Sequence, residues 1–423
     1  MKKVKAVVLG YGNRGATYAK YAVDHPELLE IVAVAEVIEN RREYARKLHN
    51  IPPDRVFSSW EELAQLPKIA DVAIIALQDR MHCEPAIAMI EKGYPLFLEK
   101  PMAENPEDCK RITEAAEKKG VHVMLGHVLR FTDFWVTLKN IIDSGEIGEI
   151  TTITHLENVG ILNYSHSFVR GNWRRSDLSS AMILQKCCHD TDIIQWLIGK
   201  PCKKVQSFGS LTHFKKENKP AGAPMRCTDG CPHAEHCYYN AIRLYYDDKD
   251  NTWLRGVAAN TVDNPPDEVV MEALKTGPYG RCIYECDNNV VDHQTVNMEF
   301  EGGCTATLTM NAFNKGGRFI RVFGTKGEIF MGADNCFHVF TIADQKTKQV
   351  PITVIGNSIT DGHGGGDTGI MVDLVKFWSE GVASKSISNI RDSYLSHLIA
   401  FAAEESRLSG KIIDLEAYSQ AIL

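Results

Sequence analysis

Two side chains suited to proton transfer, Lys100 and His189, lie 89 positions apart in this 423-residue chain. Lys100 stands in Glu99-Lys100-Pro101, directly after a short apolar segment typical of a strand. A lysine held there can donate a hydrogen bond to a substrate hydroxyl and stabilise the alkoxide that develops as a hydride leaves. His189 interrupts an apolar helix expected over residues 183–198 and can act as a general base. Each signal alone is weak, because solvated lysines paired with a glutamate and packed helix histidines are common.

A glycine-rich segment near the N-terminus points to a dinucleotide. An apolar strand runs directly into Gly10-Tyr11-Gly12-Asn13-Arg14-Gly15, and a helical pattern follows. This is G-x-G-x-x-G between a strand and a helix, where a pyrophosphate binds at the helix N-terminus. Gly10 permits the tight turn, Gly12 lets the backbone approach the phosphates, and Gly15 lets the helix pack on the strand. Glu36, which ends the next strand, is expected to accept hydrogen bonds from ribose hydroxyls.

Strands and helices alternate five times over residues 1–126, which predicts a doubly wound parallel sheet. Asn105-Pro106-Glu107 has the cap, proline and early acid of a helix start, and Gly120 is expected to end that helix. Ligands of such a sheet bind at the carboxyl ends of its strands. Besides the glycine loop and Glu36, those ends are Leu77-Gln78, Glu99-Lys100 and Gly126-His127. Lys100 is therefore expected beside a bound nicotinamide ring.

Residues 127–423 are expected to form a second, α+β domain. Segments that alternate with period two predict a large open, mostly antiparallel sheet with one covered face. These segments are residues 149–157, 205–211, 291–300, 304–312, 319–325, 328–331 and 336–342. Two closing helices carry apolar stripes, and the interpretation allows them to pack back on the first domain. Residues 215–266, rich in Pro, Cys, His and charge, read as an insertion.

Composition excludes several classes of protein. The net charge of −7 comes without a block of like charge, so neither a nucleic-acid nor a membrane partner is indicated. Hydrophobic content of 44% and charged content of 24% are typical of a soluble globular protein. The apolar run after Met1-Lys2-Lys3 is too short for a signal peptide, so we expect a cytoplasmic protein. The twelve cysteines are then not expected to form a disulfide framework.

Several motifs together resemble the Gfo/Idh/MocA oxidoreductases, over essentially the whole chain except the cysteine-rich insertion. The motifs are Gly10–Gly15, the Asp79-Arg80-Met81-His82 turn, Glu99-Lys100-Pro101, Trp173-Arg174, the His189-Asp190-Thr191-Asp192 run, residues 323–327 and residues 363–367. The resemblance implies a Rossmann domain and an α/β domain whose open sheet makes dimer or tetramer contacts. It also implies that Lys100 and His189 act on a hydroxyl of a sugar or cyclitol. His82 joins the cofactor-binding candidates on this basis.

The chain departs from the family pattern at several positions. Gln185 stands four residues before His189, where many relatives have an Asp that takes up a proton, and Lys186 replaces a small or apolar residue. Lys186 is either a second cation near Lys100, which would lower a lysine pKa, or a surface lysine. Glu36 favours NAD over NADP, although Arg41 and Arg42 leave NADP as an alternative cofactor.

Further polar and aromatic residues are candidates for substrate or metal contact. A polyhydroxy ligand suits the side chains of His155, Tyr164, His166, Trp173, Arg174, Gln185, Lys186 and His363. Asp190 or Asp192 is expected to orient His189. In the insertion, Cys227, Cys231 and Cys237 form C-x3-C-x5-C, which resembles a structural zinc site more than an iron–sulfur site. His233, His236, Cys202, Cys282 and Cys286 are alternatives for a fourth ligand, and free thiols in a loop are the other interpretation.

The sequence thus predicts an NAD-dependent oxidoreductase in which Lys100 and His189 activate a secondary hydroxyl of a carbohydrate or cyclitol. One alternative is an NAD-dependent glycosidase that oxidises a sugar transiently, eliminates the aglycone, adds water and reduces the ring again; the first loop also resembles those enzymes. Another is a sensor or scaffold that binds the dinucleotide without catalysis. A homodimer or homotetramer is expected in each case.

Overall fold

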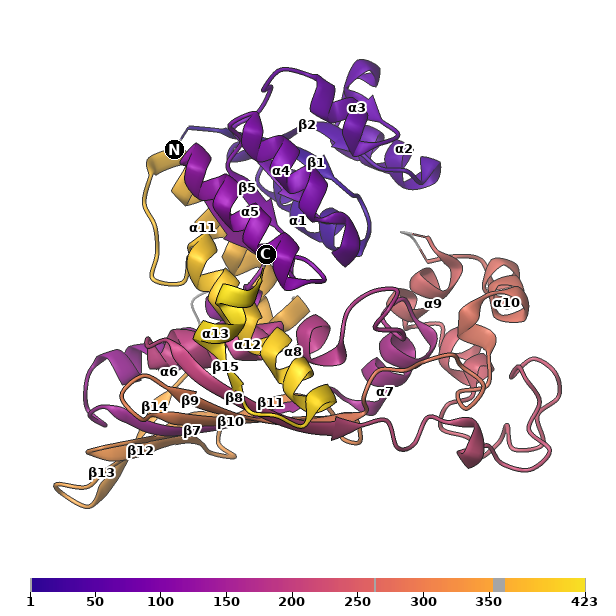
Figure 1. The fold of residues 1–423 in the computed structure, drawn as a ribbon. Helices are drawn as coiled ribbons and strands as arrows, with labels where there is room; N and C mark the ends of the chain where they lie inside the picture. Colours follow the sequence, from indigo (N-terminus) through magenta and orange to yellow (C-terminus); the bar gives the residue numbers. More distant parts are fainter. Residues whose placement is uncertain (1, 262–263, 353–361, 423) are drawn as a thin grey trace.

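The computed structural model describes residues 2–261, 264–352 and 362–422. An N-terminal α/β domain stands on one face of a long sheet, and a loop-rich insertion extends from one end of that sheet (Figure 1). The strands are β1 Val4–Leu9, β2 Leu29–Ala35, β3 Val56–Phe57, β4 Val72–Ile75, β5 Leu96–Leu98, β6 Val123–Leu125, β7 Ile150–Asn158, β8 Cys202–Ser210, β9 His293–Phe300, β10 Thr305–Asn311, β11 Gly317–Gly324, β12 Gly327–Met331, β13 Cys336–Thr341, β14 Lys346–Pro351 and β15 Ile413–Asp414. The α-helices are α1 Asn13–Asp24, α2 Glu39–Leu48, α3 Trp60–Gln65, α4 Cys83–Glu91, α5 Pro106–Lys119, α6 Asp133–Asp143, α7 Ile161–Tyr164, α8 Met182–Ile198, α9 Thr252–Ala259, α10 Asp267–Thr276, α11 Gly366–Glu380, α12 Ile390–Ser409 and α13 Leu415–Ala421.

The N-terminal sheet is parallel, in the order β3-β2-β1-β4-β5-β6. Both of its faces are covered, and alternate residues of β1 enter different cores. Val7 and Leu9 pack in the larger core, which includes α4 and α5, whereas Ala6 and Val8 pack with α1 and α11. The strand order reverses between β1 and β4, so the glycine loop lies at the topological switch point where such sheets bind ligands.

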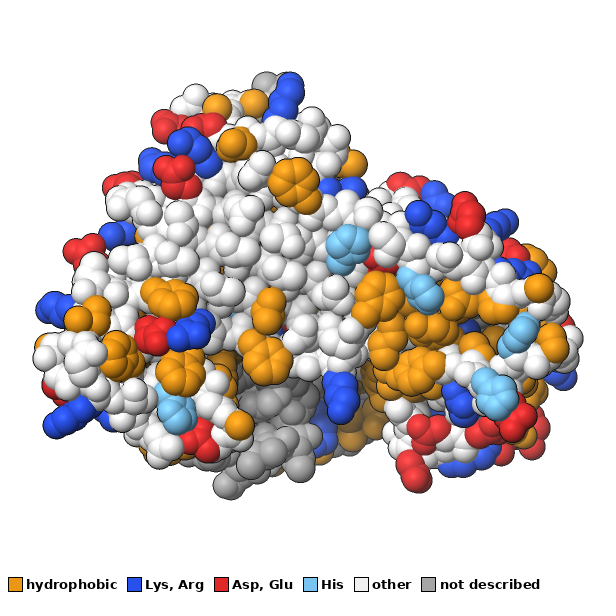
Figure 2. Space-filling model, turned by 90° about the horizontal axis from the view of Figure 1, so that it is seen from below, with side chains coloured by type: hydrophobic (Ala, Val, Ile, Leu, Met, Phe, Trp, Pro, Cys, Tyr) orange, Lys and Arg blue, Asp and Glu red, His pale blue; other side chains and the backbone are white. Residues whose placement is uncertain are grey.

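The second sheet is mixed but largely antiparallel, in the order β14-β13-β12-β11-β7-β10-β9-β8-β15. Among the described pairings, β7 and β10 run parallel and the rest of this sheet is antiparallel. Alternate residues of β9, from Gln294 to Phe300, face inward toward α8 and α12. The opposite face exposes Phe208 and Phe319, and hydrophobic side chains gather there toward the side of the insertion (Figure 2).

Most of these elements agree with those expected from the sequence. The Rossmann-type domain and the open, mostly antiparallel sheet are confirmed, and Asn105 caps α5 by accepting the Asp108 N–H at 2.8 Å. The periodicity does not predict β14, because its Lys346–Pro351 sequence is polar and exposed and has no buried face to produce an apolar alternation. Helices α9 and α10 are also additional elements, and they pack in a small core of their own with Tyr245 and Tyr279.

The two C-terminal helices join the domains. Ile370 and Leu374 of α11 belong to the same core as β1, while α12 packs against α8, α5 and β8. His397 of α12 is fully buried, and its Nε2 accepts the backbone N–H of Met102 at 3.0 Å. Its Nδ1 faces the Ser393 carbonyl at 2.7 Å, so the ring carries its proton on Nδ1. These helices hold the end of β5 against the second domain.

Candidate active site

The glycine loop has the geometry of a dinucleotide site. Gly10 has φ +87°, and a Cβ there would lie 2.5 Å from the Ala76 carbonyl oxygen. A Cβ on Gly15 would lie 2.0 Å from the Gly10 oxygen, so this position requires glycine for helix and strand to meet. A Cβ on Gly12 would meet only the Arg41 guanidinium, at 3.7 Å, so the approach to the N-terminus of α1 is open. Asn13 is exposed at this end of α1.

Glu36 is positioned by the same loop. Its carboxylate accepts the backbone N–H of Tyr11 at 2.6 Å and that of Ile38 at 2.9 Å. The carboxylate is thereby fixed at the carboxyl end of β2, beside the glycine turn. Carboxylate oxygens have further lone pairs, so these bonds leave capacity for ribose hydroxyls. The two neighbouring arginines are otherwise engaged: Arg42 donates to the Glu36 carbonyl at 2.6 Å, and Arg41 donates to Asn260 of the insertion at 2.7 Å.

Arg14 and Glu99 form a buried polar network rather than open ligand contacts. Arg14 donates to Glu99 at 2.7 Å and to both carboxylate oxygens of Asp367, and its guanidinium lies over the Tyr18 ring. Tyr18 also donates to Glu99 at 2.7 Å. Burial alone would raise the pKa of Glu99, but the Arg14 and Lys100 cations outweigh it and hold that pKa below its usual range. The ionised carboxylate also accepts the Lys100 backbone N–H, which fixes the start of the lysine segment.

Lys100 reaches across to the second domain. Its Nζ donates to the backbone carbonyl of Gln185 on α8 at 2.8 Å. His189 follows four residues later on the same helix face, about 6 Å farther along the axis. Lys100 therefore contacts α8 one helical turn before His189, and the joint action of the two side chains stays a prediction. Gln185 and His189 are both more than nine-tenths buried, so little bulk water surrounds this contact.

Other residues at the strand ends build the walls of the site. Gln78 is exposed beyond β4, next to Leu77. His82 is buried and lies between the Pro101 oxygen, 2.8 Å from Nδ1, and the Leu77 oxygen, 3.1 Å from Nε2. It thus joins the ends of β4 and β5, and its link to a cofactor stays a prediction. Asp79 accepts hydrogen bonds from Ser179 and Ser180, which tie this wall to the segment before α8.

His127 forms a second buried imidazole beside His189. The two ring centroids are 6.2 Å apart, and the His397 ring lies 5.6 Å from His127 on another side. Among the described residues, neither ring nitrogen of His127 has a hydrogen-bond partner. Burial first, and then the Arg130 cation, lower the pKa of His127 well below its usual value. Its imidazole is therefore neutral at neutral pH.

The two aspartates of the His189 run point to different partners. Asp192 forms a bidentate pair with Arg130, with both N–O distances 2.7 Å, and lies 3.5 Å from His127 Nε2. Asp190 instead faces the sheet, where His155 Nε2 and Arg318 Nε each lie 2.7 Å from its carboxylate. Asp190 therefore does not have the predicted orienting role, because successive helix residues point about 100° apart. An orienting role for Asp192 stays a prediction.

Several predicted substrate contacts are buried in the interior of the second domain. His155 is fully buried beneath α8, so the prediction that it touches substrate is wrong for this arrangement. Tyr164 is also fully buried, with its hydroxyl on the Val291 oxygen at 3.0 Å. His166 stacks on Tyr279, and burial lowers its pKa to about 3. These side chains are drawn into cores by contacts that local sequence does not encode.

The remaining candidates have mixed positions. The Lys186 side chain is 21% exposed and lies 3.5 Å from the buried Glu157 carboxylate of β7, so it is not a freely solvated surface lysine. A role as a second cation near Lys100 stays a prediction. Arg174 pairs with Asp287 at 2.8 Å, and Trp173 is half-buried against the main core. His363 lies in the short helix Gly362–Gly365, and its side chain is outside the described residues.

Cys227, Cys231 and Cys237, the predicted metal ligands, are not arranged as a complete metal-binding site. Across residues 2–261, 264–352 and 362–422, no three His, Cys, Asp or Glu side chains are arranged to hold a metal ion. His233 is engaged with the Ala221 carbonyl at 2.8 Å, and His236 points into solvent. Cys202 lies on β8, outside the insertion. The prediction of zinc therefore gains no support from the placed ligands alone.

The comparisons with known proteins agree with this geometry. Residues 4–127 match the Gfo/Idh/MocA model described as an oxidoreductase family with an NAD-binding Rossmann fold, and residues 139–417 match the model of its C-terminal α/β domain. The chain belongs to this family. Among the described residues of this Gfo/Idh/MocA protein, no helix is long and apolar enough to cross a membrane.

Individual relatives are distant. Inositol 2-dehydrogenase of Salmonella paratyphi B is 27% identical over 208 residues, which are 48% of this chain and 57% of the relative. The 2,7-anhydro-N-acetylneuraminate hydratase of Escherichia coli is 30% identical over 207 residues, 49% of this chain and 53% of the relative. The chain thus aligns with little more than half the length of these curated relatives. A scyllo-inositol dehydrogenase structure from Lactobacillus casei, with bound NAD(H) and scyllo-inositol, shares the fold with TM-score 0.66 and 17% identity, covering 98% of this chain and 100% of that one.

Proposed function

We propose that this protein is an NAD-dependent oxidoreductase that transfers a hydride between a nicotinamide cofactor and a secondary hydroxyl of a sugar, sugar derivative or inositol. The observation that carries the proposal is the contact of Lys100 with Gln185 on α8, one turn before His189. This contact supports a site in which the Lys100 ammonium group and the His189 imidazole act together at the carboxyl edge of the dinucleotide-binding sheet. The names of relatives, which include inositol dehydrogenases, support this class of substrate.

In the proposed reaction, NAD bound at the glycine loop supplies the hydride acceptor. The N-terminus of α1 and the open approach at Gly12 receive the pyrophosphate, and Glu36 receives the ribose. Lys100 donates a hydrogen bond to the substrate oxygen and stabilises its developing negative charge, while His189 accepts the hydroxyl proton. The C–H electron pair leaves with the hydride, so the alcohol becomes a ketone and one proton stays on the protein.

The surroundings of Glu36 favour NAD over NADP in this proposal. A carboxylate at this strand end accepts hydrogen bonds from both ribose hydroxyls but repels a 2′-phosphate. Arg41 and Arg42 could offset that repulsion only by giving up their present partners, Asn260 and the Glu36 carbonyl. A direct test is binding of NADH and NADPH to the purified chain by nicotinamide fluorescence, where tighter binding of NADPH would contradict the assignment.

A redox-neutral reaction is the second candidate. A relative with 30% identity is named a hydratase, so a protein of similar sequence carries out a reaction without net oxidation. In this version, which includes the NAD-dependent glycosidase interpretation, transient oxidation is followed by elimination, addition of water and return of the hydride. Gln185 is compatible with the redox-neutral reaction as well as with the dehydrogenase reaction. Its amide cannot take up a proton, and the redox-neutral reaction releases no net proton.

One experiment separates these candidates and the non-catalytic alternative. The protein and NAD are incubated with free sugars, inositols and aryl glycosides, while NADH absorbance and aglycone release are followed together. Lys100→Met and His189→Ala should each lower whichever rate appears by about 10²- to 10⁴-fold, and the exposed-lysine variant Lys200→Met should not. NADH formation supports the dehydrogenase, and aglycone release without NADH supports the second candidate. NAD binding without reaction on any substrate supports a sensor.

We also propose that two or four copies associate through the outer face of the second sheet. On this face Phe319 of β11 lies opposite Leu156 of β7, and Phe208 lies farther along the same cross-strand row, beyond Thr309 and Thr295. Phe208 and Phe319 are 60% and 53% exposed. Large apolar side chains exposed on a sheet face are a common feature of interfaces. Light scattering of the wild type and of Phe319→Lys tests it, and a monomeric wild type would contradict it.

A further inference from the structure

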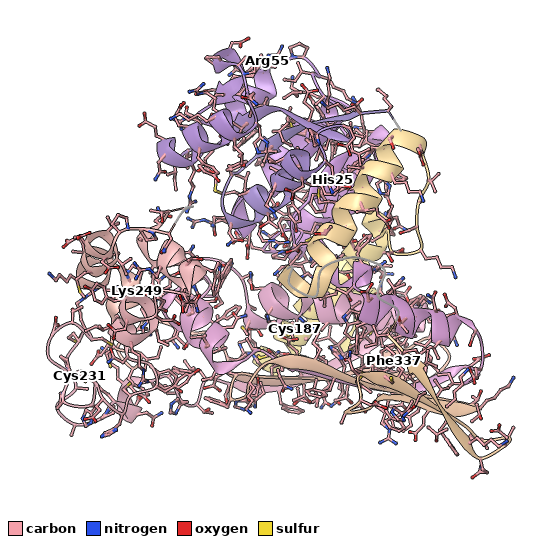
Figure 3. The ribbon with its side chains drawn as sticks, turned by 180° about the vertical axis from the view of Figure 1, so that it is seen from behind. His25, Arg55, Cys187, Cys231, Lys249 and Phe337 are labelled. Atoms are coloured by element: carbon pink, nitrogen blue, oxygen red, sulfur yellow. The ribbon has the colours of Figure 1, made fainter. Side chains whose placement is uncertain are left out.

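The cysteine-rich insertion contains a cavity that the proposed oxidoreductase chemistry does not use. The cavity is about 30 Å³ and is lined by four thiols, Cys227, Cys231, Cys237 and Cys282. Three of these cysteines come from one loop, and the fourth is contributed by a segment 45 residues farther along the chain. Figure 3 shows Cys231 in the loops of the insertion, well away from Cys187 on α8 near the candidate active site. A space of about 10–15 Å³ holds one water, so a single ion fits this cavity.

Backbone hydrogen bonds hold the two cysteine segments side by side. Arg226 and Arg281 form an isolated antiparallel bridge, with Cys227 N–H donating to Gly280 at 2.9 Å and Cys282 N–H donating to Met225 at 2.8 Å. Cys237 N–H donates to the His233 carbonyl at 2.9 Å, which turns the loop back. The C-x3-C-x5-C pattern supplies three cysteines, and the bridge brings Cys282, one of the alternatives for a fourth ligand, beside them.

A buried cation stands next to the cysteine cavity without an acidic partner. Arg170 is fully buried, donates to the carbonyls of Arg281 and Tyr239, and lies 3.8 Å from the Cys227 sulfur. Its Nη1 has no hydrogen-bond partner among the described residues, and no described carboxylate pairs with it. Burying an uncompensated charge is costly, and this site has no negative charge beside the Arg170 guanidinium among the described residues.

We propose that Cys227, Cys231, Cys237 and Cys282 bind one structural zinc ion, and that Arg170 compensates its tetrathiolate shell. Four thiolates around Zn²⁺ carry a net charge of −2, and binding releases the four thiol protons to solvent. The negatively charged zinc–thiolate group then provides a counter-charge for the Arg170 guanidinium beside Cys227. The thiols reach the ion, at Zn–S distances of about 2.3 Å, by turning their side chains into the cavity they already line.

The surrounding chain explains why the insertion would need such an ion. Between Lys216–Asn218 and Ile242–Asp247 the described chain runs through turns, apart from the single bridge at Arg226. A segment with so little regular structure buries little apolar surface of its own, and metal ligation is a usual means of stabilising one.

Elemental analysis of the full chain, purified without chelators from zinc-supplemented medium, tests the proposal. We expect about one zinc per chain in the wild type, loss of zinc in Cys231→Ser, and retention in the control Cys336→Ser. Cys231→His, which keeps a zinc ligand, should restore the metal and also covers the case in which Cys231→Ser does not fold. In a native thiol assay, four of the twelve cysteines should become reactive only after a strong chelator is added.

The opposite results are equally clear. A metal-free wild type, or zinc retained in Cys231→Ser, would overturn the site, and iron with visible absorbance would overturn the assignment to zinc. NADH binding to the same preparations is recorded separately. Failure of the zinc site therefore leaves the proposed oxidoreductase function untouched, and the reverse also holds.

Discussion

The Arg130–Asp192 pair gives the sharpest test of how the site is held together. Asp192 lies on α8, three residues after His189, and Arg130 follows β6 in the short helix Val128–Phe131. Both N–O distances are 2.7 Å, and the two side chains are 4% and 1% exposed. Solvent screens such a pair little, so removing one partner leaves an uncompensated charge that costs about 3–5 kcal/mol. Asp192→Asn should therefore raise the equilibrium constant for unfolding by roughly two to four powers of ten.

The measurement is urea-induced unfolding followed by circular dichroism and tryptophan fluorescence. Asp177→Asn is the matched control, since it breaks an exposed bidentate pair with Arg175 and should leave the midpoint almost unchanged. The double variant Arg130→Met with Asp192→Leu removes both charges, so it should recover much of the lost stability. The reasoning is refuted if Asp192→Asn is as mild as Asp177→Asn, or if the double variant is less stable than the single one.

Three other predictions follow from particular contacts. Gly15→Ala would place a Cβ 2.0 Å from the Gly10 oxygen, so it should displace α1 and weaken NADH binding at least tenfold, measured by fluorescence titration; unchanged affinity would contradict the close packing. His166 has a pKa lowered to about 3, below its unfolded value near 6.5, so its contribution to stability is complete above pH 6.5 and declines as pH falls toward 3. His166→Phe should therefore reduce the acid slope of the unfolding free energy by up to about 1.4 kcal/mol per pH unit in that window, and an unchanged slope would rule out a neutral buried ring. Asp79→Ala removes the acceptor for two serines before α8, so it should raise KM for substrate more than it lowers NADH affinity; equal effects would place Asp79 in the cofactor site instead.

Features that depend on nearby residues can be predicted from the amino-acid sequence of this protein. The glycine turn, the Asn105 cap and the alternation of β9 and β10 depend on residues a few positions apart, so backbone sterics and burial periodicity suffice to predict them. The meeting of Lys100 with the His189 helix was also within reach, because strand ends of a parallel sheet share one edge. The atom that Lys100 contacts could not be predicted. It is a backbone carbonyl, which every residue has, so the side chain of Gln185 does not indicate the contact.

The packing of distant segments determines which polar residues lie at the candidate active site and which are buried elsewhere. The strand register places Glu157 of β7 opposite Arg318 of β11. Asp190 contacts Arg318 and His155 on this side of α8, whereas His189 points to another side of the helix. The same dependence on distant segments brings Cys282 to the cysteine loop and leaves Arg170 buried beside it. These residues are dozens to more than a hundred positions apart and meet only after strands and helices pack. Local sequence therefore does not predict which charged side chains pair.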